Sequence, residues 1–283
     1  MVLLAVTDPS PIHLEKNMAE KTDLRILRII MADPAGNRTA IVRTFVPAPL
    51  RARTAAEIMQ IRSLHAEQVG FETTPLAGGA GRLEMMGGEF CGNAARSYGY
   101  LLSTERADQN EEILIEISGH TGLLKVSCDP ARKRSFAWMP MPQRLDYSPE
   151  GLPMVISEGI THMILENTDP DPDLIRRMVD RYGKKYEAFG MMFLREDRLV
   201  PVVYVEAAGS LVYESSCGSG SLAAAWYQDG RASRGLEPGR ETLYTYKEPG
   251  GDILIRLHRE EDGSLTGEMG GEILLEPERT VTL

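Results

Sequence analysis

The chain has 283 residues, of which 42% are hydrophobic and 25% are charged, and its formal net charge is −10. Because single hydrophobic cores stop growing at about 250–300 residues, this length favours two domains. The acidic balance argues against nucleic acid or an anionic membrane as a partner, since both attract clustered Lys and Arg. No apolar run approaches the ~20 residues of a membrane span, and the first residues lack a signal-peptide pattern, which favours a cytoplasmic protein.

The first half reads as strands and helices around one cysteine. Strand-like runs, the first two forming a hairpin, are predicted at 24–30, 39–45, 112–117, 122–127 and 135–141. Apolar residues at helical spacing predict a helix at about 53–67, and a second helix is expected from Cys91 onward. In the second helix Ala94, Tyr98 and Leu101 fall on one face, which we expect to be buried.

The second half repeats this order after a proline-rich segment at 139–153, which we interpret as the crossing between two domains. Strands are predicted at 154–157, 161–166, 187–194, 199–206 and 209–215, with two final hairpins at 242–257 and 264–276. A helix is predicted at 173–182, with Pro172 at its start and Gly183 at its end, and another after Cys217. The echo between the halves predicts a duplicated two-domain α+β protein with a ligand site between its domains.

Three cysteines, Cys91, Cys128 and Cys217, are too few and too widely spaced for a disulfide framework, and no Cys-x-x-Cys suggests a metal site. Two of them occupy matching positions, in FCGNAARSYGY (90–100) and SCGSGSLAAAW (216–226). In each, a cysteine followed by glycine opens an apolar helix. Cys128 has no such context and is interpreted as structural.

A helix amino terminus binds anions through its free N–H groups, and its partial positive charge lowers the pKa of a thiol. Gly92, Asn93, Gly218 and Ser219 could therefore hold a carboxylate through their N–H groups, with a sulfur beside it. Two such helix starts facing each other place one thiol on each face of a bound α-carbon. A thiolate can then remove the α-proton while the opposite thiol delivers a proton to the other face.

Other interpretations remain open at this point. A single cysteine at a helix start is more often a small buried residue than a catalyst. GSGSLA (218–223) matches a dinucleotide-binding loop, although the pattern alone is weak. Nucleophilic hydrolysis by one cysteine, with His162 as base, leaves the second cysteine unexplained.

The paired motifs CGNAAR and CGSG resemble the diaminopimelate epimerase family of cofactor-independent two-cysteine racemases, over most of residues 23–280. AGNRTAIV (35–42) resembles a stretch whose Asn binds substrate, which points to Asn37, and GITHMI (159–164) points to His162 near the thiols. The resemblance implies two pseudo-symmetric domains of the diaminopimelate epimerase fold, with the active site in the cleft between them. It also implies a homodimer that acts on an amino acid and needs no cofactor and no metal.

Departures from that family limit the substrate. Its members read E-R-G-x-G-E-T before the second cysteine, where the Arg holds a distal carboxylate, but no Arg lies between Arg198 and Cys217 in this chain. The Asn that precedes the family's His is replaced by Ile160. Diaminopimelate is therefore a doubtful substrate. Proline racemases typically carry C-G-H at the first site, so CGN favours a primary α-amino acid.

Within the family the chain is most similar to histidine racemases of opine metallophore pathways, in EQVGF (67–71), FGMMF (189–193) and SLVYESSCGSG (210–220). This similarity implies interconversion of L- and D-histidine, with Glu67 and Glu214 as acidic partners in the cleft and Gln68 as a substrate contact. A diaminopimelate or other diamino-acid epimerase and a non-catalytic amino-acid-binding relative are the alternatives.

The domain boundaries follow from these patterns and from the family resemblance. They are an extension at 1–22, a first domain at 23–142, a second domain at 143–269, and a segment 270–283 that returns to the first domain.

Overall fold

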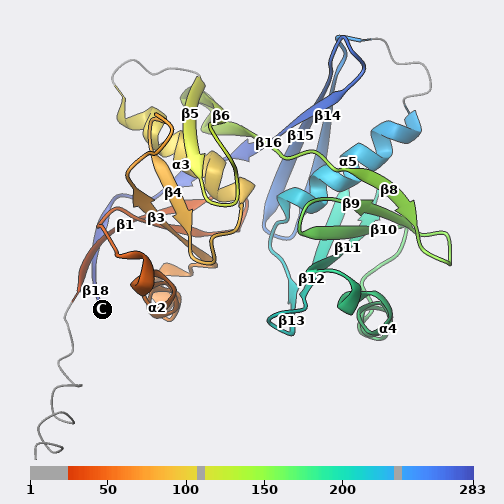
Figure 1. The fold of residues 1–283 in the computed structure, drawn as a ribbon, viewed down its shortest axis with the longest axis horizontal. Coiled ribbons are helices and arrows are strands. Elements are labelled where there is room, and N and C mark those ends of the chain that lie inside the picture. Colours follow the sequence, from red (N-terminus) through yellow and green to blue (C-terminus); the bar gives the residue numbers. More distant parts are fainter. Residues whose placement is uncertain (1–24, 107–111, 233–237) are drawn as a thin grey trace, which may run out of the picture.

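The structure is a computed structural model that describes residues 25–106, 112–232 and 238–283, so the expected extension at 1–22 lies outside the described residues. Two lobes of similar build lie side by side (Figure 1). The helices are α2 (Ala48–Met59), α3 (Gly92–Glu105), α4 (Pro172–Tyr182) and α5 (Gly218–Ala232). None of these described helices is long and apolar enough to cross a membrane.

The first lobe contains the strands β1 (Ile26–Asp33), β2 (Thr39–Val42), β3 (Gln68–Thr73), β4 (Arg82–Met85), β5 (Glu112–Ile117), β6 (Leu124–Asp129), β7 (Arg134–Trp138), β17 (Leu274–Leu275) and β18 (Arg279–Thr282). The second contains β8 (Arg144–Tyr147), β9 (Pro153–Ile156), β10 (Ile160–Glu166), β11 (Ala188–Arg195), β12 (Arg198–Val205), β13 (Ser210–Tyr213), β14 (Glu241–Glu248) and β15 (Gly251–Arg259). A further strand, β16 (Leu265–Glu272), pairs with both lobes.

Strand pairing follows the same order in both lobes. In the first, β1–β2 is antiparallel, β2–β3 parallel, β3–β4 antiparallel, β4–β5 parallel, and β5–β6 and β6–β7 antiparallel. In the second, β9–β10, β10–β11, β11–β12, β12–β14, β14–β15 and β15–β16 repeat that sequence. Helices α2 and α4 each connect the first parallel pair of their lobe, and α3 and α5 connect the second. Each cysteine-bearing helix therefore occupies the equivalent place in its lobe.

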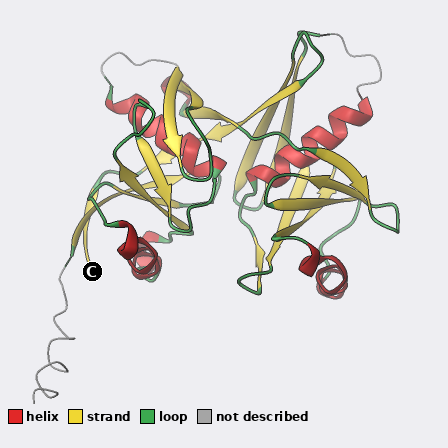
Figure 2. Cartoon of the chain, viewed as in Figure 1, coloured by secondary structure: helices red, strands yellow, loops and turns green. Residues whose placement is uncertain are grey.

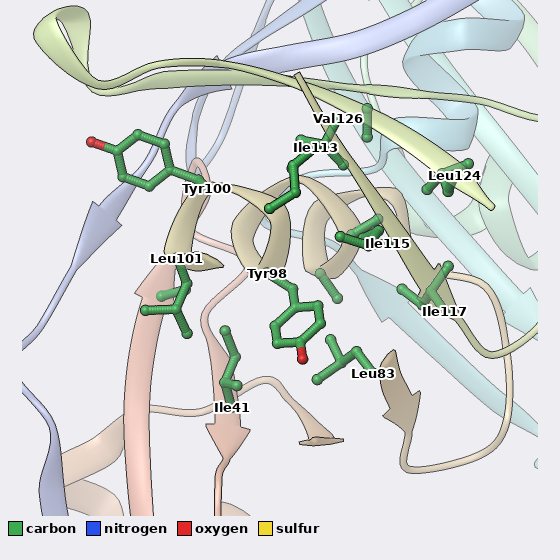
Figure 3. Packing of buried hydrophobic residues seen from close by; sticks show 14 of the residues in the cluster. Ile41, Leu83, Tyr98, Tyr100, Leu101, Ile113, Ile115, Ile117, Leu124 and Val126 are labelled. Atoms are coloured by element: carbon green, nitrogen blue, oxygen red, sulfur yellow. The ribbon is translucent and has the colours of Figure 1, made fainter. Parts of the chain in front are cut away.

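The central helix α3 is buried on nearly all sides. Ala94, Tyr98 and Leu101 are buried as predicted, but so are most other residues of the helix. Figure 3 shows Tyr98 facing Leu83 on one side of α3 while Ile113 lies on the other. Helix α5 forms the core of the second lobe in the same way, through four consecutive buried residues, Leu222, Ala223, Ala224 and Ala225.

The C-terminal segment crosses from one lobe to the other. β16 pairs with β15 of the second lobe and with β7 of the first. β17 and β18 then pair with β1, so the last strand lies beside the first in Figure 1. The predicted hairpin at 264–276 is therefore wrong, because an alternating pattern identifies a strand but not its partner.

Two other predicted elements differ from the structure. The helix expected at 53–67 is α2 and ends at Met59, and it is followed by a separate 3₁₀ turn at Arg62–Leu64. His65 has φ 48°, a left-handed conformation that ends this turn. The crossing expected at 139–153 contains β8, which pairs antiparallel with β9, so much of that segment belongs to the second lobe.

Candidate active site

Both cysteine-bearing helices begin at the junction of the lobes and run outward from it (Figure 2). Cys91 is the N-cap of α3, and its sulfur accepts the Ala94 N–H at 3.4 Å. Cys217 directly precedes α5, and its carbonyl accepts the Ser221 N–H at 2.9 Å. The two thiols therefore occupy equivalent positions at the amino ends of two buried helices.

The residues beside the thiols join the lobes directly. Asn93 Nδ2 donates to Ser216 Oγ at 2.9 Å, and both side chains are buried. Ser215 Oγ donates to Glu67 Oε1 at 2.7 Å. Gly36 and Gly250 also meet backbone to backbone, since a Cβ on Gly36 would lie 2.6 Å from the Gly250 Cα.

A chain of amides links Cys91 to the lobe junction. Gln68 Nε2 donates to Asn37 Oδ1 at 2.6 Å, and Asn37 Nδ2 donates to Glu67 Oε2 at 3.3 Å. Burial raises the pKa of the Cys91 thiol, while the Ala94 N–H and the Gln68 side chain act in the opposite direction. The structure thus brings together Asn37, Glu67, Gln68 and Cys91, all of which were expected at the site from the sequence.

Cys217 is only 6% exposed and lies among acidic and hydroxyl groups. Its sulfur is 3.6 Å from Ser219 Oγ, which is in turn 3.2 Å from His162 Nε2. Burial, and then the carboxyls of Glu214 and Glu248, raise the pKa of this thiol well above its usual value. His162, Glu214 and Ser219 are thus gathered around Cys217.

The Ser219 hydroxyl lies within reach of both the Cys217 sulfur and His162 Nε2. His162 is fully buried, and burial lowers its pKa to about 4. A neutral imidazole is therefore expected near pH 7, and its Nδ1 has no hydrogen-bond partner among the described residues. This geometry does not favour His162 as the base of a hydrolytic cysteine.

Sequence reasoning missed two buried ionisable residues here, Arg96 and Glu248. Arg96 is 0% exposed and donates to Asn93 Oδ1 at 3.1 Å and to the Glu272 carbonyl, also at 3.1 Å. Glu248 is 7% exposed and accepts the Cys217 N–H at 2.6 Å. A signal for Glu248 was present, because strand alternation puts it on the same face as the apolar Tyr246.

Methionine side chains cover the glycines that follow both cysteines. A Cβ on Gly218 would lie 2.0 Å from Met269 Sδ, and a Cβ on Gly92 would lie 3.0 Å from Met269 Cε and 2.6 Å from Met139 Sδ. A Cβ at either position would require a methionine side chain to shift.

Among the described residues, no group of three or more His, Cys, Asp and Glu side chains could hold a metal ion. The helix starts at the junction carry two thiols, with amides near Cys91 and carboxyls near Cys217, and the Arg96 guanidinium interacts with both Cys91 and Glu248. Such an arrangement can bind a small carboxylate through backbone N–H groups and exchange protons with it.

The fold resembles those of several solved structures. A hydroxyproline epimerase from Agrobacterium vitis superposes with a TM-score of 0.61 at 13% identity, over 92% of this chain and 93% of that one. A PhzF-family phenazine biosynthesis protein from Enterococcus faecalis also gives a TM-score of 0.61, at 14% identity, over 92% of this chain and all of that one. At these identities the likeness concerns the mixed α/β fold alone.

Sequence relatives are more specific. A histidine racemase of Fusobacterium nucleatum is 35% identical over 226 residues, covering 72% of this chain and 81% of that protein. A histidine racemase of Staphylococcus aureus strain Mu50 is 26% identical over 253 residues, covering 83% and 90%. The family model described as the histidine racemase CntK N-terminal domain matches residues 26–274. The chain is therefore an isomerase that belongs to the histidine racemase family.

Proposed function

We propose that this protein racemises histidine at the α-carbon by a cofactor-independent mechanism in which Cys91 and Cys217 act as opposed acid and base. The observation that carries the proposal is that both cysteines start buried helices at one junction, where Asn93 of one lobe binds Ser216 of the other. The histidine racemases of F. nucleatum and S. aureus support histidine as the substrate.

The reaction is a proton exchange across the α-carbon. One thiolate forms an S–H bond as the α-C–H bond breaks, and the electron pair left on carbon delocalises into the carboxylate. The opposite thiol then gives up its proton to the other face of the carbon, so the two sulfurs exchange charge. N–H groups of Gly92, Asn93, Gly218 and Ser219 would hold the carboxylate and stabilise its growing charge.

Acidic and amide side chains at the junction suit the rest of the substrate. Glu67 and Glu214 would attract its ammonium group or a protonated imidazole, and Asn37 and Gln68 would add hydrogen bonds. His162 would act through Ser219, whose hydroxyl is near both the imidazole and the Cys217 sulfur.

Substrate entry requires the lobes to move, because Cys217 is almost fully covered. We infer that residues 23–142 and 143–269 act as duplicated domains that open at the junction. The segment 270–283 would stay with the first, to which β17 and β18 are paired. A dry closed site makes each thiolate a stronger base towards an α-proton.

The biological setting is inferred from the family resemblance alone. We propose a cytoplasmic homodimer that supplies D-histidine to an opine metallophore pathway. Size-exclusion chromatography with light scattering tests the dimer, and a monomer at micromolar concentration would contradict it.

The proposal is tested by incubating the reduced, metal-free protein with a panel of L-amino acids that includes histidine, diaminopimelate and diaminobutyrate. We expect D-histidine to accumulate towards a 1:1 mixture, and diaminopimelate to react far more slowly because no Arg lies between Arg198 and Cys217. Preferred turnover of a diamino acid would change the substrate assignment. No turnover of any amino acid would overturn the racemase assignment.

A further inference from the structure

Glu248 is a buried carboxyl at the start of α5 that the proton exchange described above does not use. It is the last residue of β14 and is 7% exposed. Its Oε2 accepts the Cys217 N–H at 2.6 Å, and its Oε1 accepts the Ser221 hydroxyl. The turn after it is held as well, since the Gly250 N–H donates to the Ser215 carbonyl at 2.8 Å.

This contact changes what the start of α5 can do. A free backbone N–H at a helix start stabilises a negative charge nearby. In this chain the Cys217 N–H is already bound to a carboxyl, so it contributes less to stabilising a thiolate at Cys217. Glu214 also faces the sulfur, and burial and the carboxyls of Glu214 and Glu248 are the largest influences on the pKa of this thiol, all of which raise it. The hydroxyl of Ser219, with the neutral His162 behind it, completes the set of groups around Cys217.

Cys91 has different surroundings. Its sulfur accepts the Ala94 N–H and contacts the Gln68 amide. The buried guanidinium of Arg96 attracts a negative charge on Cys91, and it also interacts with the carboxyl of Glu248. Glu89, which is exposed to solvent, also opposes ionisation of this thiol, but less strongly than burial does. The two helix starts are therefore alike in backbone and unlike in charge.

We propose that Glu248 is a positioning residue that anchors the start of α5 and, by occupying the Cys217 N–H, disfavours a thiolate at Cys217, so that the resting enzyme carries its thiolate at Cys91. This inference rests on the proposed two-thiol function. It means that the first α-proton goes to Cys91, forming its S–H bond, while Cys217 loses its proton to the opposite face. Each such turnover leaves the thiolate on Cys217.

Alkylation of each cysteine by iodoacetamide reads the thiolate directly, because the thiolate displaces iodide and the thiol does not. Peptide mass spectrometry separates Cys91, Cys217 and Cys128. In the wild type we expect the alkylation rate of Cys91 to rise with pH at a lower pH than that of Cys217. The reverse order would overturn the proposal, and this comparison needs no variant.

Glu248→Gln keeps the acceptor for the Cys217 N–H and removes the charge. Burial and the Glu214 carboxyl raise the pKa of Glu248 to about 8, against the Ser221 hydroxyl, the Cys217 N–H and the Arg96 guanidinium, which lower it. Its charge therefore acts only at higher pH. We therefore expect the Cys217 alkylation rate to rise about tenfold at about pH 9 and to stay unchanged at about pH 6.5. An unchanged rate at both pH values would contradict the proposal.

The matched control is Glu268→Gln, which alters another buried carboxyl, one that pairs with Arg256. It should leave the alkylation rates of Cys91 and Cys217 unchanged. The buried Cys128 reports general loosening, so a parallel rise at all three cysteines in Glu248→Gln would count against a specific role. Racemisation is measured separately. If the cysteines are alkylated in the predicted order but no amino acid turns over, the proposed function is wrong and this inference stands. If histidine turns over but the alkylation order is reversed, this inference is wrong and the proposed function stands.

Discussion

Met269 offers a sharp test of how the two helix starts are held, because it contacts Gly218 and also lies against Gly92. A Cβ on Gly218 would lie 2.0 Å from Met269 Sδ, whereas carbon and sulfur need about 3.5–4 Å, so something must move by about 1.5 Å. Gly218→Ala should therefore destabilise the fold by about 1–3 kcal/mol. Because Cys217 directly precedes Gly218, racemisation should slow as well, by up to ~100-fold.

Once Met269 is replaced by alanine, Gly218→Ala should no longer destabilise the fold. Met269 is fully buried, so Met269→Ala alone should cost about 2–5 kcal/mol. In that background the three atoms nearest to the new Cβ are gone, and alanine is the better helix former by up to about 1 kcal/mol. Gly218→Ala should then be neutral or stabilising.

Urea unfolding of the two single variants and the double variant measures the coupling, which should exceed about 1 kcal/mol. Gly230→Ala is the control, since Gly230 lies on the same helix and a Cβ added there would have no neighbour within 4 Å. It should be neutral or slightly stabilising in both backgrounds. If the effects of Gly218→Ala and Met269→Ala on the free energy of unfolding are additive, the packing of Met269 against Gly218 does not restrict that position.

Three further predictions concern charge and chemistry. Cys91→Ser and Cys217→Ser should each lower racemisation by about 10²–10⁴-fold, measured by chiral chromatography, and either variant keeping a tenth of wild-type activity would contradict the two-thiol mechanism. Burial of Glu116 is outweighed by three backbone N–H groups and Arg82, which lower its pKa to about 2. The stability that its charge contributes is complete above its unfolded pKa and disappears as pH falls through about 2. The melting temperature of Glu116→Gln should therefore approach that of the wild type in acid, and plots of melting temperature against pH that stay parallel would exclude this linkage. The pKa of Glu248 is raised to about 8, so between about pH 5 and pH 8 the native state keeps a proton that the unfolded state has lost. The free energy of unfolding should therefore decrease over this range in the wild type but not in Glu248→Gln. Equal slopes of unfolding free energy against pH in the two proteins would exclude this effect of Glu248.

The parts of the site that sequence reasoning reached are those with a local cause. A cysteine before glycine at the start of an apolar helix is visible within a few residues, and Cys91 and Cys217 do occupy helix starts. The likeness of the halves was also visible, because it lies in the order of the elements. Strand alternation would have identified Glu248 as an inward residue had it been applied to Thr245–Glu248.

What could not be predicted depends on how the two lobes meet. The hydrogen bond from Asn93 to Ser216 and the wedge formed by Met269 join segments far apart in the chain, so no local pattern encodes them. The return of β17 and β18 to β1 was expected only from the family resemblance, and the pattern at 264–276 pointed instead to a hairpin.

The central claim is that two thiols at one junction exchange the α-proton of histidine. Incubating the reduced protein with L-histidine in D₂O tests it most directly, with mass spectrometry for deuterium at the α-carbon and chiral chromatography for D-histidine. In a two-base reaction the proton delivered to the product comes from the solvent-equilibrated thiol, so early D-histidine should carry deuterium while the remaining L-histidine stays largely unlabelled. D-histidine without deuterium would contradict the account. So would a folded protein that shows neither exchange nor racemisation.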